Sequence, residues 1–409
     1  MRPRLALVVP VFPTLSETFI VSKFLGLLDR GYDVHIVCGR HARENWTLFP
    51  ELKASQGIAW RIHTVWPTWN KGLAVLLLPL AILLALFRSP KITLQYLNRG
   101  IRRFGIGVFR HFYLDLPLIL TGPAIVHFEF GALAVGRMHL RELLSCRVTI
   151  SFRGHDLNFS GLDQQGCYLD VWSTADALHF LGESLWRRAQ HRGCPPDKPH
   201  VLIPPAIDTD FFAPVDRQTP ANDGSSERPI RILSVGRLHW AKGYEYALQA
   251  IRLVRDCGLN VEYHIVGDGQ HLEAVAFCCH QLGLEDCVRL LGALHHGRVR
   301  EEMLWADIFL HAAVSEGFSN AVLEAQAMRL PVVCTDANGL PENVVNGVTG
   351  FVVPRRDPVA LAEKLLTLTN DPALRAQFGR AGRERVLRYF DLKQQLNAVS
   401  AFYDAVWSS

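Results

Sequence analysis

The sequence lacks the cysteine pattern of a disulfide framework. Its nine cysteines are an odd number scattered along 409 residues, so we expect reduced thiols, as is usual in the cytoplasm. Four residues of metal-binding types do fall close together, at Cys278, Cys279, His280 and Cys287. Their spacing is irregular and the first three belong to an apolar-periodic helix, so packing explains them better than a zinc site does.

A strong net charge and a membrane-spanning run are also missing. The formal net charge of +4 is too small to indicate nucleic-acid binding. The longest apolar run, residues 72–87, is shorter than the ~20 residues of a spanning helix, and Pro79 interrupts it. The short apolar run at residues 5–9 is followed by no convincing cleavage site, so we expect a first buried strand there rather than a signal peptide.

Acidic residues are absent from Leu52 to Leu114. The apolar run at residues 72–87 lies inside this stretch and has basic neighbours on both sides. An apolar surface flanked by cations suits the headgroup region of an anionic bilayer, and we expect contact with one membrane face without a span. A buried core helix with solvated basic neighbours is the alternative. The basic residues of the stretch are Lys53, Arg61, Lys71, Arg88, Lys91, Arg99, Arg102, Arg103 and Arg110.

Short apolar runs alternate with amphipathic segments in both halves of the chain, which is typical of βαβ units and a mostly parallel sheet. Residues 214–229 are rich in Pro, Asp, Asn and Ser and predict a linker between the halves. The first half has candidate strands at residues 5–9, 34–38, 125–128, 148–152, 178–181 and 202–204. The second half has them at 230–235, 261–266, 288–291, 308–310 and 332–334, and later helices are expected at 358–369, 373–390 and 392–407.

This alternation predicts an α/β protein with two Rossmann-like domains facing a central cleft. Hydrophobic residues make up 49% of the chain, so each domain can bury a core of its own. Ligands of such sheets bind at the carboxyl ends of the strands. The expected divisions are a first domain at residues 1–213, a linker at 214–229, a second domain at 230–385 and a helical segment at 386–409.

The segment Ser315–Glu324 combines a strand end, a tight loop and the start of a helix. It follows the apolar run at 308–310, and residues 317–320 predict the loop. Such a loop presents free backbone N–H groups and the positive end of a helix dipole, which suit an anionic ligand. Glu316 precedes the helix and Glu324 lies more than a turn inside it, so the two carboxylates can contact different hydroxyl groups of one ligand. Ordinary capping of a helix is the alternative.

Two cations follow the first strand of the second half. Gly236 permits close backbone approach, and Arg237 and Lys242 come immediately after it. A diphosphate is well bound by a planar arginine fork together with a compact lysine charge, although surface cations after a strand are common. Glycine turns beyond other strands are weak signals when taken singly. They lie at residues 266–269, 339–342 and 346–351.

Taken together and in this order, these pieces resemble the retaining glycosyltransferases of the GT4 family, which have the GT-B fold. The resemblance covers essentially the whole second domain. It implies that the C-terminal helices cross back to the first domain. It rests on Ser234-Val235-Gly236-Arg237-Leu238 with Lys242-Gly243, on Gly267-Asp268-Gly269, on Glu316-Gly317-Phe318-Ser319-Asn320 with Glu324, and on Asn346-Gly347 with Thr349-Gly350-Phe351.

The resemblance implies a role for each matching residue. Arg237 and Lys242 would hold the donor diphosphate and stabilise the departing nucleotide. Glu324 would bond the ribose hydroxyls, and Glu316 would position the donor sugar, with backbone amides of the loop over sugar and phosphate. The donor-binding residues implied in this way are Gly236, Arg237, Lys242, Gly267, Glu316, Gly317, Phe318, Ser319, Asn320 and Glu324.

In the first domain, the segment Phe12–Ile20 lacks the glycine-rich loop that many relatives carry. It looks instead like the segment of bacterial colanic acid and amylovoran biosynthesis glycosyltransferases. Ser16 could also simply cap the following helix. The acceptor-side residues implied are Ser16, Glu17, Glu129, Arg153 and Asp156.

The segment Ser151–Asp156 matches a family position at which a strand-end histidine, here His155, reaches the donor sugar. One departure from the family is Pro205-Ala206, where relatives usually have Asn-Gly, and it puts the details of the interdomain hinge in doubt. The catalytic residues implied are His155, Glu316, Arg237 and Lys242.

The resemblance implies a hexosyltransferase that acts with retention, through an oxocarbenium-like transition state, and passes the acceptor proton to the leaving phosphate. The donor would be a nucleotide-diphosphate sugar, with UDP favoured and GDP possible. The acceptor would be a polyprenyl-diphosphate-linked oligosaccharide of exopolysaccharide biosynthesis at the inner face of the cytoplasmic membrane. No convincing Asp-X-Asp motif accompanies the site, so we expect cations rather than a metal or another cofactor to neutralise the leaving group.

Three other functions fit the same pattern. A glycolipid acceptor would need the same donor site. A nucleotide-sugar epimerase can share the two-domain architecture, and it would change the sugar without an acceptor. A catalytically inactive membrane scaffold is the third, and the presence of Arg237, Lys242, Glu316 and Glu324 argues against it.

Overall fold

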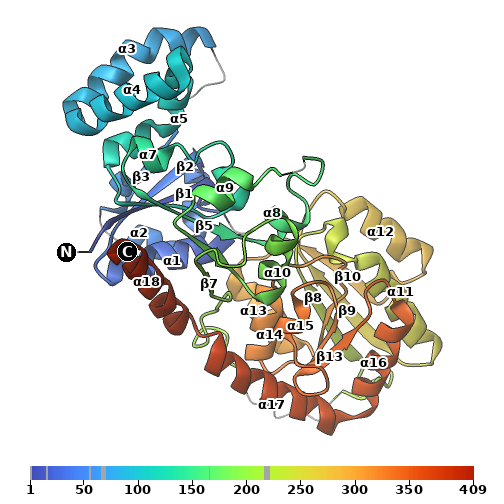
Figure 1. The fold of residues 1–409 in the computed structure, drawn as a ribbon. Helices are drawn as coiled ribbons and strands as arrows, with labels where there is room; N and C mark the ends of the chain where they lie inside the picture. The colour runs from blue at the N-terminus through green and yellow to red at the C-terminus, as the bar shows by residue number, and fades with distance from the viewer. Residues whose placement is uncertain (1, 15–16, 55–56, 66–70, 165, 216–221) are drawn as a thin grey trace. The chain divides into compact units, whose positions relative to one another are not determined.

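The computed structural model describes residues 2–14, 17–54, 57–65, 71–164, 166–215 and 222–409. The chain divides into two compact units, each built on one parallel sheet (Figure 1). Unit 1 comprises Met1–Phe180, Trp186–Ile203 and Leu396–Ser409, and unit 2 comprises Leu181–Leu185 and Pro204–Gln395. Each unit is described separately below.

Unit 1 contains a seven-stranded sheet in the order β3-β2-β1-β4-β5-β6-β7. All neighbouring strands are parallel, so their carboxyl ends meet at one edge. The order reverses between β1 and β4, which is the position where doubly wound sheets bind ligands. The strands are β1 Arg4–Phe12, β2 Asp33–His41, β3 Ile62–Thr64, β4 Ile125–Phe128, β5 Arg147–Phe152, β6 Ala177–Phe180 and β7 His200–Leu202.

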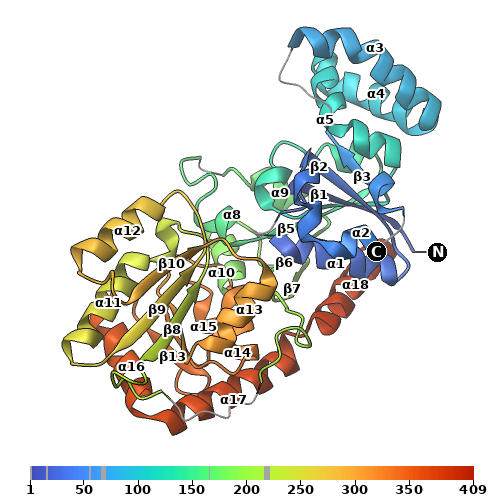
Figure 2. The same ribbon diagram turned by 180° about the vertical axis from the view of Figure 1, so that it is seen from behind.

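The helices of unit 1 include a group of three, α3, α4 and α5, in the connection from β3 to β4. In both views α3 and α4 run side by side and stand away from the sheet (Figure 1, Figure 2). The α-helices are α1 Thr18–Asp29, α2 Pro50–Ala54, α3 Lys71–Arg88, α4 Pro90–Phe104, α5 Val108–Thr121, α6 Gly131–Ala134, α7 Leu140–Leu143, α8 Gly154–Asn158, α9 Leu169–Thr174, α10 Glu183–His191 and α18 Leu392–Ser408, and the 3-10 helices are η2 Arg43–Leu48, η3 Ile58–Arg61 and η4 Gly105–Gly107.

Unit 2 contains a six-stranded sheet in the order β10-β9-β8-β11-β12-β13, again parallel throughout. Its order reverses between β8 and β11. The elements are β8 Ile230–Val235, η5 Trp240–Lys242, α11 Tyr244–Asp256, β9 Val261–Val266, α12 Leu272–Gln281, β10 Val288–Gly292, α13 His296–Trp305, β11 Ile308–His311, α14 Asn320–Ala327, β12 Val332–Thr335, α15 Leu340–Asn343, β13 Gly350–Val353, α16 Pro358–Asn370 and α17 Pro372–Tyr389.

The C-terminal helix α18 packs into the core of unit 1. Phe402 and Tyr403 are buried in the same apolar cluster as Phe24 of α1. A methyl group added at Gly26 would overlap the Leu396 side chain, so α1 and α18 approach closely at this glycine. The sequence therefore correctly predicted that the C-terminal helical segment returns to the first domain.

The two-domain α/β fold and the eleven expected strands are confirmed, with shifts of up to three residues at their ends. Two strands were not predicted. β3 has only three residues, and β13 begins at Gly350 inside a segment that was interpreted as a turn. The amphipathic helix α4 was also missed, because Gly100 and a cluster of arginines interrupt its apolar pattern.

Candidate active site

Two loops at the carboxyl ends of β8 and β9 interlock through backbone contacts. The N–H of Gly236 donates to the carbonyl oxygen of Val266 at 2.9 Å, and the N–H of Leu238 donates to that of Asp268 at 2.9 Å. A Cβ atom at Gly267 would overlap the carbonyl oxygen of Gly236, and the backbone there has φ +146°. Glycine is therefore required at this predicted position for close backbone approach.

Arg237 lies in the first of these loops and is exposed. In the part of the chain that the structure describes, it forms no ion pair. Lys242 follows at the end of η5, where Gly243 turns the chain with φ +62° into α11. The Lys242 side chain is only 19% exposed. The two predicted cations therefore have different surroundings, one solvated and one mostly enclosed.

Lys242 and His311 converge on the carboxylate of Glu316. The Nζ atom of Lys242 donates to Oε2 of Glu316, and Nε2 of His311 lies 3.1 Å from the same oxygen. Burial by itself would raise the pKa of Glu316, but the Lys242 charge and the His311 hydrogen bond lower that pKa to about 2. Burial lowers the pKa of His311 despite its acidic neighbour. Glu316 is therefore ionised at neutral pH.

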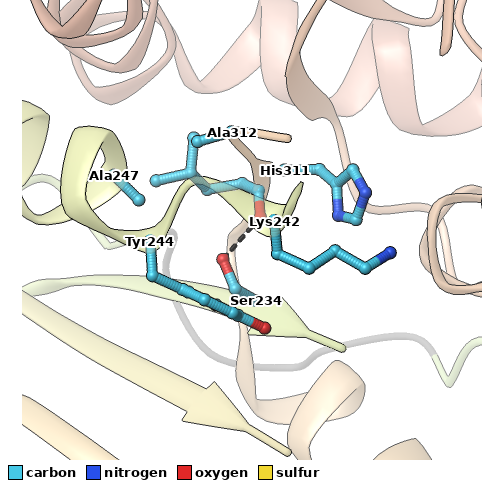
Figure 3. A pocket seen from close by; sticks show the side chains of 7 residues that line it. Ser234, Lys242, Tyr244, Ala247, His311 and Ala312 are labelled. Carbon is cyan, nitrogen blue, oxygen red and sulfur yellow. Dashed lines mark hydrogen bonds between the residues drawn. The ribbon is translucent and has the colours of Figure 1, made fainter. Parts of the chain in front are cut away.

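A small pocket lies beside this cluster, between the carboxyl ends of β8 and β11 and the start of α11. The amino group of Lys242 lies on the same side of it as the His311 ring (Figure 3). Ser234 lines the pocket, and its hydroxyl group donates a hydrogen bond to the carbonyl oxygen of Leu310 at 2.5 Å. The lining residues are Ser234, Lys242, Tyr244, Ala247, Leu310, His311 and Ala312.

The loop from Glu316 to Ser319 is fixed by contacts on the side of α15. The N–H of Gly339 donates to the carbonyl oxygen of Glu316 at 3.1 Å, and a Cβ atom at Gly339 would overlap the carbonyl oxygen of Gly317. Asn343 and Ser319 exchange two hydrogen bonds of 3.0 Å. This arrangement holds the loop against α15, so the position of Glu316 depends on Gly339 and Asn343, which follow it by 23 and 27 positions.

The same loop opens the eight-residue helix α14. The Ser319 hydroxyl accepts from the N–H of Val322 and caps the helix. Phe318 points into the protein, 9% exposed, with its ring 5.7 Å from that of Phe390. The N–H groups of Gly317 and Phe318 have no hydrogen-bond acceptor within the described ranges. Asn320 is the first residue of the helix, so the helix starts one residue earlier than the loop predicted at residues 317–320 implied.

Glu324 lies in α14 and is 9% exposed. Among the described residues its carboxyl group has neither a hydrogen-bond donor nor a cation as partner. Burial raises its pKa to about 7. A nearly buried carboxyl group without a protein partner is costly and is well placed to accept hydrogen bonds from hydroxyl groups of a ligand.

His155 belongs to unit 1, where it lies in the short helix α8 directly after β5. It is exposed, and its Nδ1 atom lies 3.0 Å from the Ser160 hydroxyl. Its Nε2 atom has no partner within the described ranges. The hydrogen bond with Ser160 therefore orients the ring and leaves Nε2 without a protein partner in the described part of the chain.

Three of the predicted acceptor-side residues form a buried structural network instead of an open surface. Glu129 is 0% exposed, with Lys23 Nζ at 2.6 Å from one oxygen and Arg153 Nη2 at 3.0 Å from the other. Asp156 is 1% exposed and accepts from the N–H groups of Arg153 and Ala132 at 2.9 and 3.0 Å. The oxygens of Glu129 and Asp156 thus have protein partners, and the expected place of both residues on the acceptor side stays a prediction.

Arg153 is the third member of that network. Its guanidinium lies 3.8 Å from the centroid of the Phe19 ring, and 15% of its side chain is exposed. Glu17 is half-buried at the N-terminus of α1. Ser16 lies outside the described residues, so its expected role stays a prediction.

Two residues of the unit 2 site were not identified from the sequence. His311 ends β11 and touches Glu316, and the signal that could have revealed it is a polar residue at the end of an otherwise apolar strand. Asn343 is 0% exposed and lies in α15 after the glycine turn. The sequence did not indicate a role for Asn343, because asparagine is common in turn segments of this kind.

The described residues contain no group of three or more His, Cys, Asp or Glu side chains that could hold a metal ion. Cys278 and Cys279 lie in α12, and the Cys287 thiol donates to the carbonyl oxygen of Leu284 at 3.5 Å.

The sequence matches known glycosyltransferases over most of its length. Residues 216–385 match the family described as glycosyl transferases group 1. The chain is 30% identical over 391 residues to the amylovoran biosynthesis glycosyltransferase AmsK of Erwinia amylovora, covering 88% of this chain and 89% of that protein. It is 27% identical over 404 residues to WcaL of Escherichia coli (strain K12), named for colanic acid biosynthesis, covering 93% and 94%.

Solved structures share the fold at lower sequence identity. Anabaena Alr3699/HepE, crystallised with UDP-glucose, has a TM-score of 0.75 at 15% identity and covers 99% of this chain and 100% of that one. Sucrose-phosphate synthase from Thermosynechococcus elongatus has a TM-score of 0.72 at 16% identity, with both chains fully covered. These likenesses agree with the GT-B architecture that the sequence predicted. The chain is a glycosyltransferase and belongs to the group 1 family.

Proposed function

We propose that this enzyme moves a sugar from a nucleotide-diphosphate donor to a lipid-linked oligosaccharide in exopolysaccharide biosynthesis. The reaction would retain the configuration of the donor sugar. The names of AmsK and WcaL, which refer to amylovoran and colanic acid, support the pathway class. Only the sequence resemblance supports polyprenyl diphosphate as the lipid carrier of the acceptor.

The main support for a donor site is the arrangement of charged side chains around the loop before α14. An ionised Glu316, held by Lys242 and His311, stands at one end of the loop, and the unpartnered Glu324 stands inside the following helix. Between them, the free N–H groups of Gly317 and Phe318 suit phosphate oxygens. In this proposal Glu316 orients the sugar and Glu324 binds the ribose hydroxyls.

The leaving nucleotide would be stabilised by cations of the protein. Arg237 is exposed and unpaired in the described ranges, and Lys242 can shift from Glu316 toward a phosphate oxygen that competes for it. The bond between the anomeric carbon and the phosphate oxygen breaks, and the bond to the acceptor oxygen forms on the same face. The acceptor proton passes to the departing phosphate, and no metal cofactor is needed for the charge balance.

UDP is the favoured nucleotide and GDP the second. HepE, with the same fold, was crystallised with UDP-glucose, and a mannosyltransferase of Mycolicibacterium smegmatis that is 28% identical over 285 residues is named as GDP-mannose-dependent. His155 would contact the donor sugar through its free Nε2 atom. Membrane attachment from the cytoplasmic side would follow from a lipid-linked acceptor.

The test is a screen of UDP- and GDP-sugars against lipid-linked oligosaccharides extracted from membranes, with mass and linkage analysis of the product. We expect one sugar to be added, with an α linkage from an α-linked donor and with turnover that survives a chelator. A β linkage from that donor would overturn retention. Transfer only to a glycolipid would replace the proposed acceptor, and conversion of the free donor sugar without acceptor would overturn transfer as the main reaction.

A further inference from the structure

Large apolar side chains are exposed on the outer face of α3, and its two fully buried residues are small. Ala81 and Ala85 are 0% exposed, whereas Leu76 is 75% exposed and Phe87 is 90% exposed. A surface helix in water has the opposite arrangement, with its large apolar residues turned inward. The exposed apolar residues of α3 are Leu73, Val75, Leu76, Leu80, Leu83, Leu84 and Phe87.

Exposed apolar residues also lie on the neighbouring helix. Leu94 and Ile101 of α4 are 59% and 51% exposed and lie two turns apart on one helix face, and Ile106 of η4 is 88% exposed. We call the exposed apolar residues of α3, α4 and η4 together the α3–α4 face. Contiguous exposed apolar surface of this kind marks an interaction site. None of the helices in the described ranges combines the length and apolarity needed to cross a bilayer.

The exposed charges that residues 71–121 contribute to the α3–α4 face are all positive. Residues 71–121 contain a single acidic residue, Asp115, which is 0% exposed. Its oxygens are occupied by Tyr96 at 2.8 Å, Arg137 at 2.8 Å and His139 at 2.7 Å. The exposed surface of α3, α4 and α5 therefore carries no carboxylate.

Four cations of this surface are exposed and form no ion pair within the described ranges: Arg88, Lys91, Arg102 and Arg110. Arg88 and Lys91 flank the Ser89 turn that joins α3 to α4, and Arg102 lies in the last turn of α4. Arg103, in contrast, is paired with Glu142 at 2.9 Å. Free cations thus lie at both ends of the two side-by-side helices, with the apolar residues between them.

We propose that the α3–α4 face lies flat on an anionic lipid bilayer. The apolar side chains would enter the boundary between headgroups and acyl chains, and the free cations would contact lipid phosphates. With 18 residues, α3 would extend about 27 Å along the membrane plane. The inference rests on the proposed function, because binding to a bilayer would bring the enzyme to a lipid-linked acceptor.

A second copy of the chain fits the surface less well. A symmetric contact through the same face would bring the unpaired cations of two copies together, with no exposed carboxylate from residues 71–121 to balance them. A partner protein with an acidic surface would satisfy the charges but needs no lipid. These occupants are distinguished by the experiment.

The experiment measures sedimentation of the full chain with phosphatidylcholine vesicles, with and without phosphatidylglycerol. We expect binding to the anionic vesicles, and a decrease in affinity of about tenfold or more for Leu83→Asp/Phe87→Asp. The matched control is Phe277→Asp, which changes a 60% exposed phenylalanine of unit 2 and should bind like the wild type. A second variant, Arg88→Gln/Lys91→Gln/Arg102→Gln, should lose the preference for phosphatidylglycerol and its dependence on salt.

Each variant is checked for thermal stability and for UDP-glucose and GDP-mannose binding by calorimetry, which should match the wild type. The proposal is overturned if the wild type binds neither vesicle, or if Leu83→Asp/Phe87→Asp binds as well as the wild type. It is also overturned if light scattering shows a wild-type dimer that this variant dissociates, because a second copy then covers the face. Vesicle binding without sugar transfer would contradict the proposed function and leave the docking surface intact.

Discussion

Lys242 and Glu316, 74 positions apart, form an ion pair at the carboxyl ends of β8 and β11. Only 19% of the Lys242 side chain and 15% of the Glu316 side chain are exposed, so solvent and salt screen the pair less than a surface pair. His311 adds a second contact to the same carboxylate oxygen. A donor diphosphate would have to compete with Glu316 for Lys242. Donor binding would therefore weaken the ion pair and release the Glu316 carboxylate from the lysine.

Removing Lys242 should therefore change both the stabilisation of the leaving diphosphate and the ionisation of Glu316. For Lys242→Ala we expect kcat/KM of transfer to fall by about 10²-fold or more, because one cation of the leaving-group site is lost. The pKa of Glu316 should rise at the same time, since the Lys242 charge is the main influence that lowers it. The measurement is nucleotide release as a function of pH. An additional loss of activity in the acid range should appear in the variant and be absent in the wild type.

The control for this variant is Lys393→Ala. Lys393 and Asp210 also form an ion pair, at 3.4 Å, but their side chains are 80% and 84% exposed. Exposed pairs contribute little, so activity should stay at the wild-type level. Equal activity of Lys242→Ala and Lys393→Ala would contradict the role given to Lys242.

Glu324 should make donor binding depend on pH near neutrality. Burial raises its pKa to about 7, and hydroxyl groups donate better to the ionised form. Affinity for a bound nucleotide sugar should therefore decrease as the pH falls through about 7. The probes are UDP-glucose and GDP-mannose, because their substituted diphosphates have no proton that titrates there. In Glu324→Gln the affinity should be lower and independent of pH in this range.

The same pKa predicts how stability without a ligand depends on pH. The folded value of about 7 lies above the ordinary value of 4.5, so the folded protein holds this proton more tightly than the unfolded chain. The contribution is fully present below 4.5 and is lost as the pH rises through 7. Glu324→Gln should remove this loss, which amounts to about 3 kcal/mol at most. Urea unfolding of both proteins at acidic and alkaline pH measures this difference in the free energy of unfolding. The same pH dependence in both proteins would contradict the unpartnered state of Glu324.

The parts of the site that lie in continuous motifs could be predicted from the sequence. The strand, loop and helix around Glu316 have strong local signals, namely an apolar run, a glycine and a capping serine. The pairing of Lys242 with Glu316 could not be predicted, because it depends on the tertiary contact between two strand ends that are distant in sequence. The surroundings of Glu129 could not be predicted for a related reason. Its burial depends on Lys23 from α1 and Arg153 beyond β5, which no local pattern reveals.

The fold was more predictable than the site, for a physical reason. Strands such as β8 and β11 are buried in a parallel sheet and are therefore almost continuous apolar runs between turns. The outer face of α3 shows the limit of this argument. Its leucines give the same apolar signal as a core helix, and only the structure separates exposed from buried residues.

Gly339→Ala should disturb the Glu316 loop from outside the motif. The added Cβ would overlap the carbonyl oxygen of Gly317, a backbone atom that cannot move as a flexible side chain would. We expect a destabilisation of about 1–3 kcal/mol and a higher KM for the donor. The measurements are urea unfolding and donor kinetics. Gly107→Ala is the control, because its nearest neighbour would lie 3.9 Å away. An unchanged donor KM in Gly339→Ala would show that the loop position does not matter for the donor.

Glu129→Gln should reduce stability without a specific effect on the acceptor. The carboxylate is 0% exposed and pairs with Lys23 and Arg153, so its neutralisation leaves buried cations incompletely compensated, at a cost of about 3–5 kcal/mol. Burial would raise the pKa of Glu129, but these cations hold it well below 4.5, so its contribution is present above 4.5 and is lost as the pH falls. Thermal unfolding at neutral and acidic pH should show the largest difference at neutral pH. The control, Glu44→Gln, breaks the exposed pair with Arg40 and should change little. A raised acceptor KM with unchanged stability would instead support the place of Glu129 in the acceptor site.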